Sequence, residues 1–229
     1  MHNKSPSKGI LIQLWTLLRG YRSYLGQALL RSRWRVKNTI GKGALISKDV
    51  IIPCGASIGE NAILGSGVYL SQGVSVGRGA HLFNISVGDN SSVDYGVLCT
   101  GYGSGKIHIG KESYIGIRNI LDWSDHISIG DFVHIAGPST ALWTHTSARM
   151  SFHGLPLFRK DDKHYRPTAP ITVESNVYIG GNCTIYPGVT IHHHAVIVPN
   201  SAVTKDVPSY ALYGGVPAKL IKIISPESF

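Results

Sequence analysis

Aliphatic residues recur every six positions along most of the chain. The first series is Ile40, Ile46, Ile52, Ile58, Leu64, Leu70, Val76 and Leu82. After one dropped residue the pattern resumes at Val87 and Val93, continues through 109–120 and 129–140, and ends with Val173, Ile179, Ile185, Ile191, Ile197 and Val203. A six-residue period fits neither a helix nor an array of hairpins, but it fits a short strand followed by a tight turn. The pattern therefore predicts a solenoid whose stacked coils bury one continuous aliphatic column.

The six-residue pattern stops between residues 141 and 170. The interruption begins with ALWTHTS and contains His145 near its start, together with His153 and His164. Since the pattern is regular on both sides, we expect a loop insertion over 146–169 that leaves the solenoid and covers a site beside His145.

The C-terminal third carries short segments that identify a resemblance. PITV, NVYIGG, YPGVTI, VTKDVP and GGVPAKLIK occur in order between residues 170 and 222. In these segments the chain resembles the hexapeptide-repeat acyltransferases, most closely the maltose, galactoside and nodulation-factor O-acetyltransferases, over residues 107 to 224. Residues before about 100 match only the generic repeat, and that longer stack resembles the enzymes that acetylate capsular, O-antigen or exopolysaccharide sugars. The resemblance implies an all-β left-handed parallel β-helix with three hexapeptides per coil, usually a homotrimer, that uses acetyl-CoA.

The resemblance also assigns roles to residues near the interruption. His145 stands where the family has its catalytic histidine, and a neutral imidazole can accept the proton of an attacking hydroxyl near neutral pH. His153 and His164 are competitors within the variable loop. Asn119 and Asp122 correspond to acceptor-binding or oxyanion contacts, although their spacing departs from the family pattern and puts a simple sugar acceptor in doubt; both residue types also serve as ordinary turn residues.

Coenzyme A is expected between adjacent subunits along the C-terminal coils. By the same resemblance its contacts are Gly181, Pro199, Thr204, Lys205, Lys219 and Lys222. Pro199 replaces a small residue, which removes a backbone donor. Lys219 and Lys222 replace arginines, which keeps the charge and loses the bidentate geometry. A solvated C-terminal tail is the alternative reading of these lysines.

Composition places a different kind of segment at the N-terminus. The net charge is +9, yet ten of the 22 Lys and Arg lie within residues 1–48, which hold no acidic residue, so the remainder is close to neutral. We expect three regions: a basic amphipathic helical segment over 1–38, the β-helix over 39–210, and a C-terminal tail over 211–229. The helical segment either contacts an anionic membrane surface or caps the solenoid, and its apolar stretch is far shorter than the roughly 20 residues that span a bilayer.

Other features narrow the functional classes. Three scattered cysteines (Cys54, Cys99 and Cys183) are typical of free thiols in a cytoplasmic protein. The run His192–His194 is interpreted as corner or surface residues rather than a metal site, and nothing points to nucleic-acid binding. The sequence thus predicts an acetyl-CoA-dependent O-acetyltransferase of a cell-surface saccharide without a metal. The alternatives are an amino-sugar or antibiotic acetyltransferase on the same fold, or a non-catalytic scaffold.

Overall fold

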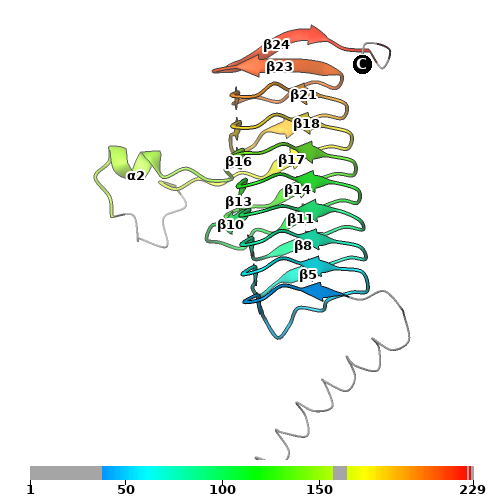
Figure 1. The fold of residues 1–229 in the computed structure, drawn as a ribbon. Helices are drawn as coiled ribbons and strands as arrows, with labels where there is room; N and C mark the ends of the chain where they lie inside the picture. Colours follow the sequence, from blue (N-terminus) through cyan, green and yellow to red (C-terminus); the bar gives the residue numbers. More distant parts are fainter. Residues whose placement is uncertain (1–37, 157–163, 226, 228–229) are drawn as a thin grey trace, which may run out of the picture. The chain divides into compact units, whose positions relative to one another are not determined.

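The computed structural model describes residues 38–156, 164–225 and 227. The chain divides into two units, 1–37 and 38–229, and the predicted N-terminal helical segment lies almost entirely outside the described residues. Within the second unit, short parallel strands stack into a solenoid with three sheets, which we call A, B and C (Figure 1). The predicted all-β parallel β-helix is confirmed.

Each sheet takes one strand from nearly every coil. Sheet A contains β1 (Thr39–Ile40), β3 (Ser57–Ile58), β6 (Ser75–Val76), β9 (Ser92–Val93), β12 (Tyr114–Ile115), β15 (His134–Ile135), β18 (Tyr178–Ile179), β21 (Val196–Ile197), β23 (Ala211–Gly215) and β24 (Ala218–Ile223). Sheet B contains β2 (Leu45–Ile46), β4 (Ile63–Leu64), β7 (His81–Leu82), β10 (Leu98–Thr100), β13 (Ile120–Asp122), β16 (Ala141–Leu142), β19 (Thr184–Ile185) and β22 (Ala202–Val203). Sheet C contains β5 (Val68–Leu70), β8 (Ile85–Val87), β11 (Ile107–Ile109), β14 (Ile127–Ile129), β17 (Ile171–Val173) and β20 (Thr190–Ile191).

The recurring aliphatic residues form the core. In register, Ile58 pairs with Val76 and Ile115 with Ile135, and these side chains are almost fully buried. Because successive side chains of a strand point to opposite faces, the residue before each of them points outward. The first positions of the series depart from this: Ile40 is 43% exposed, because the described stack ends there.

The corners between strands use residues that tolerate a left-handed backbone. At the corner that joins sheet A to sheet B, the residue with positive φ is Gly or Asn in six of the eight described coils: Gly43, Asn61, Gly79, Gly96, Asn182 and Asn200. Arg118 (φ 53°) and Ser139 (φ 64°) occupy the same position in the other two coils. Gly and Asn adopt this conformation at little cost, whereas most other residues do not.

Two segments leave the regular stack. Between β16 and β17, the region of the expected insertion, a loop projects from the solenoid and carries the short helix α2 (Ala148–Phe152) (Figure 1). At the C-terminus the expectation of a tail from residue 211 needs correction, because β23 and β24 form an antiparallel hairpin that extends sheet A beyond β21. Within the described residues no helix is long and apolar enough to cross a membrane.

Candidate active site

His145 and Asp122 are in contact at the base of the projecting loop. Nδ1 of His145 lies 2.6 Å from Oδ2 of Asp122. Asp122 is the last residue of β13, and His145 follows β16, the strand that pairs with β13 in sheet B. Neighbouring coils therefore bring together two residues that are 23 positions apart in the sequence. Asp122 is fully buried, and 16% of the His145 side chain is exposed.

Asp122 is held in place by donors on both carboxylate oxygens. The Thr144 backbone N–H donates to Oδ2 at 2.9 Å, and the Thr144 hydroxyl lies 3.0 Å from the same oxygen. The Ser124 backbone N–H donates to Oδ1 at 3.1 Å and the Ser124 hydroxyl at 2.7 Å. A buried carboxylate with this many donors is fixed in both position and orientation.

A short antiparallel neck fixes the backbone of His145. His145 forms a bridge with Thr168, the Thr146 N–H donates to the Pro167 carbonyl at 3.3 Å, and the Ala169 N–H donates to the Thr144 carbonyl at 2.9 Å. The expected insertion over 146–169 thus begins and ends in this neck. His145 therefore lies at the junction between the solenoid and the projecting loop.

The contact with Asp122 determines which nitrogen of His145 can act as a base. Because the carboxylate is a hydrogen-bond acceptor, we assign the proton of the neutral ring to Nδ1. The lone pair then lies on Nε2, the nitrogen directed away from Asp122. This arrangement is that of a general base oriented by a buried carboxylate.

Aromatic residues that the sequence interpretation missed surround the His145 ring. Tyr102 contacts it edge to face with ring centroids 5.1 Å apart, and Trp143 does so at 6.3 Å. Arg166, from the far side of the loop neck, places its guanidinium carbon 3.3 Å from the Tyr102 ring centroid, and partial burial lowers the pKa of this guanidinium. These residues enclose the base within a partly apolar, partly cationic environment.

The segment 101–105, GYGSG, carries the signal that could have revealed Tyr102. It is a second, smaller break in the six-residue pattern, and it packs directly on Asp122 and Ser124. A side chain at Gly101 (φ +133°) would place its Cβ 2.6 Å from Oδ1 of Asp122, and one at Gly103 (φ +136°) would place it 2.6 Å from the Ser124 carbonyl oxygen. The Tyr102 backbone N–H donates to the Ser124 hydroxyl at 3.2 Å. The glycines thus allow this segment to lie against the Asp122–His145 pair.

The structure gives Asn119 a position that does not suit the expected acceptor contact. Its side chain is fully buried, its amide N–H groups approach the carbonyls of Ile135 and Ala136 at 3.2 and 3.3 Å, and its Oδ1 accepts the Thr140 N–H at 2.9 Å. All of these partners belong to the solenoid wall. Asn119 thus links two coils, and the buried Asp122 contacts His145 rather than open solvent.

The expected coenzyme contacts fall in three places. Gly181 and Pro199 lie at the corner between sheets A and B, where the Asn200 N–H donates to the Gly181 carbonyl at 3.1 Å. Thr204 and Lys205 are exposed and directly follow β22 of sheet B. His145 follows β16 of the same sheet, so Thr204 and Lys205 lie at the same corner as His145 but two coils later. Lys219 and Lys222 are exposed on the terminal hairpin.

A bulge in β24 brings the two hairpin lysines to one face. Lys222 pairs with Leu212 and Lys219 with Gly214, while one extra residue, Ile221, interrupts the register between them. Leu212 and Gly214 are two positions apart on their strand and therefore face the same way. Without the bulge, three residues of spacing would place the lysines on opposite faces.

The histidines of the loop and of the 191–196 segment contact groups outside this cluster. His153 and His164 are exposed in the loop, where both contact the Tyr165 ring. In the 191–196 segment, His192 Nδ1 lies 3.0 Å from Glu174 Oε1, and His193 and His194 are exposed beside Tyr210. Over the described part of the chain, no group of three or more His, Cys, Asp or Glu is arranged to hold a metal ion. The three cysteines are free, as expected, and burial raises the pKa of Cys99 to about 12.

Comparison with known families identifies the repeat. The profile described as "Bacterial transferase hexapeptide (six repeats)" matches residues 39–72 and 170–205, on both sides of the site. Over these two segments the chain is similar to bacterial hexapeptide transferases. The loop neck and the Asp122 coil lie between the two matched segments.

Curated proteins to which this chain is similar are named as acetyltransferases. It is 37% identical over 143 residues to the galactoside O-acetyltransferase of Escherichia coli (strain K12), a match that covers 61% of this chain and 64% of the relative. It is 27% identical over 149 residues to the putative lipopolysaccharide biosynthesis O-acetyl transferase WbbJ of the same organism, covering 54% and 75%. The chain thus spans less than two thirds of the galactoside enzyme.

Solved structures show the same fold. The N-acyltransferase AntD from Bacillus cereus, in complex with dTDP and 3-hydroxybutyryl-CoA, superposes with a TM-score of 0.55 at 23% identity, over 73% of this chain and 85% of that one. A second AntD structure, of a point mutant in complex with an amino-sugar nucleotide and coenzyme A, gives a TM-score of 0.53 at 24% identity over 73% and 86%. These matches support the parallel β-solenoid fold.

Proposed function

We propose that this protein is an acetyl-CoA-dependent O-acetyltransferase that acts on a saccharide hydroxyl, with His145 as the general base. The observation that carries the proposal is the 2.6 Å contact between His145 Nδ1 and a fully buried, donor-saturated Asp122 at the mouth of the loop. A structural histidine would not require an oriented carboxylate together with an outward-directed Nε2. Asp122 is a positioning residue in this scheme.

The geometry supports a direct transfer reaction. The acceptor hydroxyl gives its proton to Nε2 of His145 while its oxygen forms a bond to the thioester carbonyl carbon. The imidazolium formed is balanced by the Asp122 carboxylate. When the tetrahedral intermediate collapses, the carbon–sulfur bond breaks, and the proton on Nε2 passes to the leaving thiolate. The acetyl ester and the free thiol of coenzyme A are the products.

Similarity supports the choice of substrates. The galactoside relative and WbbJ are named as O-acetyl transferases, one of a sugar and one in lipopolysaccharide biosynthesis. A chloramphenicol acetyltransferase of Agrobacterium fabrum is 31% identical over 109 residues and covers 43% of this chain and 52% of the relative, so an antibiotic acceptor belongs in any test panel. The long stack before the site favours a cell-surface polysaccharide unit over a free sugar.

The separation of the expected coenzyme contacts favours an assembly. Gly181 and Pro199 lie at a different corner from Thr204 and Lys205, so one coenzyme that uses both sets would have to cross sheet B or lie between two copies of the chain. A homotrimer with coenzyme between its subunits meets this requirement. A cytoplasmic location and a membrane-surface role of residues 1–38 stay predictions.

The test is transfer from acetyl-CoA to galactosides, oligosaccharides, amino sugars and chloramphenicol, followed as thiol release, with wild type, His145→Ala and His153→Ala. We expect His145→Ala to lose at least about a hundredfold in kcat, the scale of a lost general base. His153→Ala tests the competing histidine and should stay within a few-fold of wild type. Equal rates for wild type and His145→Ala would refute the mechanism, and transfer only to amines would reassign the acceptor class.

A further inference from the structure

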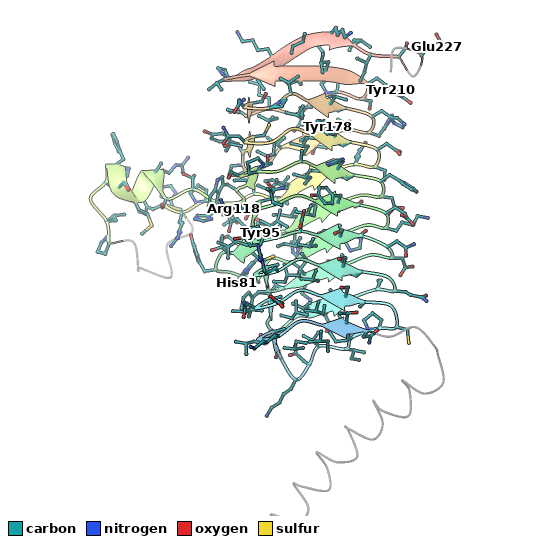
Figure 2. The ribbon with its side chains drawn as sticks, viewed as in Figure 1. His81, Tyr95, Arg118, Tyr178, Tyr210 and Glu227 are labelled. Atoms are coloured by element: carbon teal, nitrogen blue, oxygen red, sulfur yellow. The ribbon has the colours of Figure 1, made fainter. Side chains whose placement is uncertain are left out.

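Two arginines lie over one tyrosine ring at the corner between sheets A and B. The guanidinium carbons of Arg78 and Arg118 lie 5.0 and 5.5 Å from the centroid of the Tyr95 ring. The three residues come from three successive coils, because Gly96 donates its N–H to the Arg78 carbonyl and Arg118 donates its own to the Tyr95 carbonyl. Figure 2 shows Tyr95 and Arg118, with His81 further along, on one edge of the solenoid.

This corner keeps its positive charge. Among the described residues no ion pair joins Arg78 or Arg118 to a carboxylate. Carboxylates in this part of the stack include those of Glu60, one coil before Arg78, and Asp94. Asp94 accepts hydrogen bonds from the Tyr95 N–H and the Tyr114 hydroxyl, each at 2.6 Å. The hydrogen bond from Arg118 and the charges of both guanidinium groups lower the pKa of Tyr95.

The backbone at Arg118 gives a second, independent reason to look for a ligand. Its φ of 53° lies in the left-handed region, at a corner position where six other coils have Gly or Asn. An arginine there is strained, and such strain is often found at functional sites. The stack does not need this side chain, because the adjacent coils close the same corner with Gly96 and Ser139. What arginine adds at this position is the cation.

The corner is linked to the candidate active site by one strand. Arg118 lies two residues before β13, and Asp122 ends that strand, so the two residues are at most about 13 Å apart at the usual rise of a strand. The outward residues of sheet B beside this path include Leu98, which is 38% exposed, and Ile120. The expected coenzyme contacts lie in later coils and in the terminal hairpin. The arginine corner is therefore separate from the expected coenzyme contacts, and it adjoins the sheet that carries Asp122.

We propose that Arg78, Tyr95 and Arg118 form a binding site for the carboxylate or phosphate groups of an acidic saccharide polymer. A guanidinium over an aromatic ring is pre-organised and keeps its N–H edge available to a planar or tetrahedral anion. The acceptor of the proposed acetyltransferase would then be anionic and longer than one sugar, with its reacting unit at His145 and another unit at this corner. The inference rests on the proposed function for its biological meaning, but the binding itself can be measured without catalysis.

The experiment is equilibrium binding to the full chain of polygalacturonate, poly(glycerol phosphate) and neutral dextran of matched length. The test variant is Arg78→Gln/Arg118→Asn, and the control is Lys48→Gln/Lys111→Gln, which removes the same charge from exposed sites at other corners. We expect one of the acidic polymers to bind wild type and the control, and to bind the test variant about tenfold more weakly, the scale of a lost charge-assisted contact. Which polymer binds distinguishes carboxylate from phosphate.

Several outcomes would overturn the proposal. Equal weakening in both double variants would mean nonspecific attraction, and weakening of acetyl-CoA binding instead of polymer binding would assign the corner to the coenzyme. No binding of either acidic polymer would also reject it. Arg118→Asn should unfold at the same or a higher temperature than wild type, so that misfolding cannot explain lost binding. Polymer binding by His145→Ala separates this proposal from the catalytic one, since that variant should bind normally even where transfer fails.

Discussion

Replacing Asp122 with Asn tests the central contact of the proposed site. An asparagine has nearly the same shape, but one of its two terminal atoms is a donor. If the amide nitrogen occupies the place of Oδ2, it faces the Thr144 backbone N–H and His145 Nδ1. If it occupies the place of Oδ1, it faces the Ser124 backbone N–H. In either orientation one buried backbone N–H loses its acceptor, which costs about 1–3 kcal/mol of unfolding free energy.

The effect on catalysis should be larger than the effect on stability. In the first orientation His145 Nδ1 must become an acceptor, which moves the proton to Nε2 and removes the base. In the second, the tautomer survives, but the charge that balances the imidazolium is lost. We therefore expect kcat to fall by about 10²-fold or more, within the range of general-base catalysis, with little change in KM for acetyl-CoA.

The assay is thiol release at saturating acetyl-CoA, paired with thermal unfolding of the same preparations. Asp131→Asn is the matched control, because Asp131 also sits at a corner and accepts the Lys111 N–H at 2.9 Å, in a coil contact that does not involve His145. A folded Asp122→Asn protein with kcat within about threefold of wild type would refute the view that Asp122 orients the base.

Two further predictions address the packing and the charge of the solenoid. Gly101→Ala should lower kcat at least about tenfold and stability by about 1–3 kcal/mol, because its Cβ would lie 2.6 Å from Asp122 Oδ1 and 2.7 Å from the Ser124 nitrogen. Gly154→Ala is the control, because Gly154 also has a positive φ but a Cβ there would meet nothing within 4 Å. Equal kcat values and equal denaturant midpoints for the two variants would contradict the packing argument. The hydrogen bond from the phenol to Asp94, together with burial, raises the pKa of Tyr114 from its ordinary 10.0 to about 12. The neutral phenol therefore stabilises the fold fully below about pH 10, and this contribution is lost as the pH rises towards 12. In Tyr114→Phe, the urea midpoint should therefore fall less steeply between pH 9 and 12 than it does in wild type. The same pH dependence of the midpoint in both proteins would reject this explanation.

The fold could be predicted because one physical rule repeats at each coil. A single aliphatic residue every six positions is enough to place Ile58, Ile115 and Ile197 in the same column. The rule fails at the C-terminus, where β23 and β24 bury little and pair as a hairpin. The bulge at Ile221 depends on pairing between those strands, so it has no signal in the spacing of the residues.

The site could be predicted only in part. The place of His145 at the break and the family resemblance both point to it, whereas Asp122 is expected as a site residue with a different role. Its partners Ser124 and Thr144 are common residue types whose importance arises only when two coils stack. Tyr102 lies in the shorter break at 101–105, and its role becomes clear only when that segment packs on Asp122 and Ser124. Asn119 is expected to be a site residue because a sequence does not distinguish an amide that links two coils from an amide that binds an acceptor.

The loop neck has a consequence for how this protein can change. β14 pairs directly with β17, and β16 with β19, so the stack closes across the insertion without help from the 28 residues between Leu142 and Ile171. The entropy of closing a loop grows only with the logarithm of its length, and a doubling costs about 0.6 kcal/mol. Insertions, deletions and substitutions in the loop beyond the neck should therefore change the free energy of unfolding of the solenoid only slightly. Selection can reshape the loop that projects beside His145 almost independently of the coils, so chains with nearly identical solenoids can diverge in the molecules that they bind there.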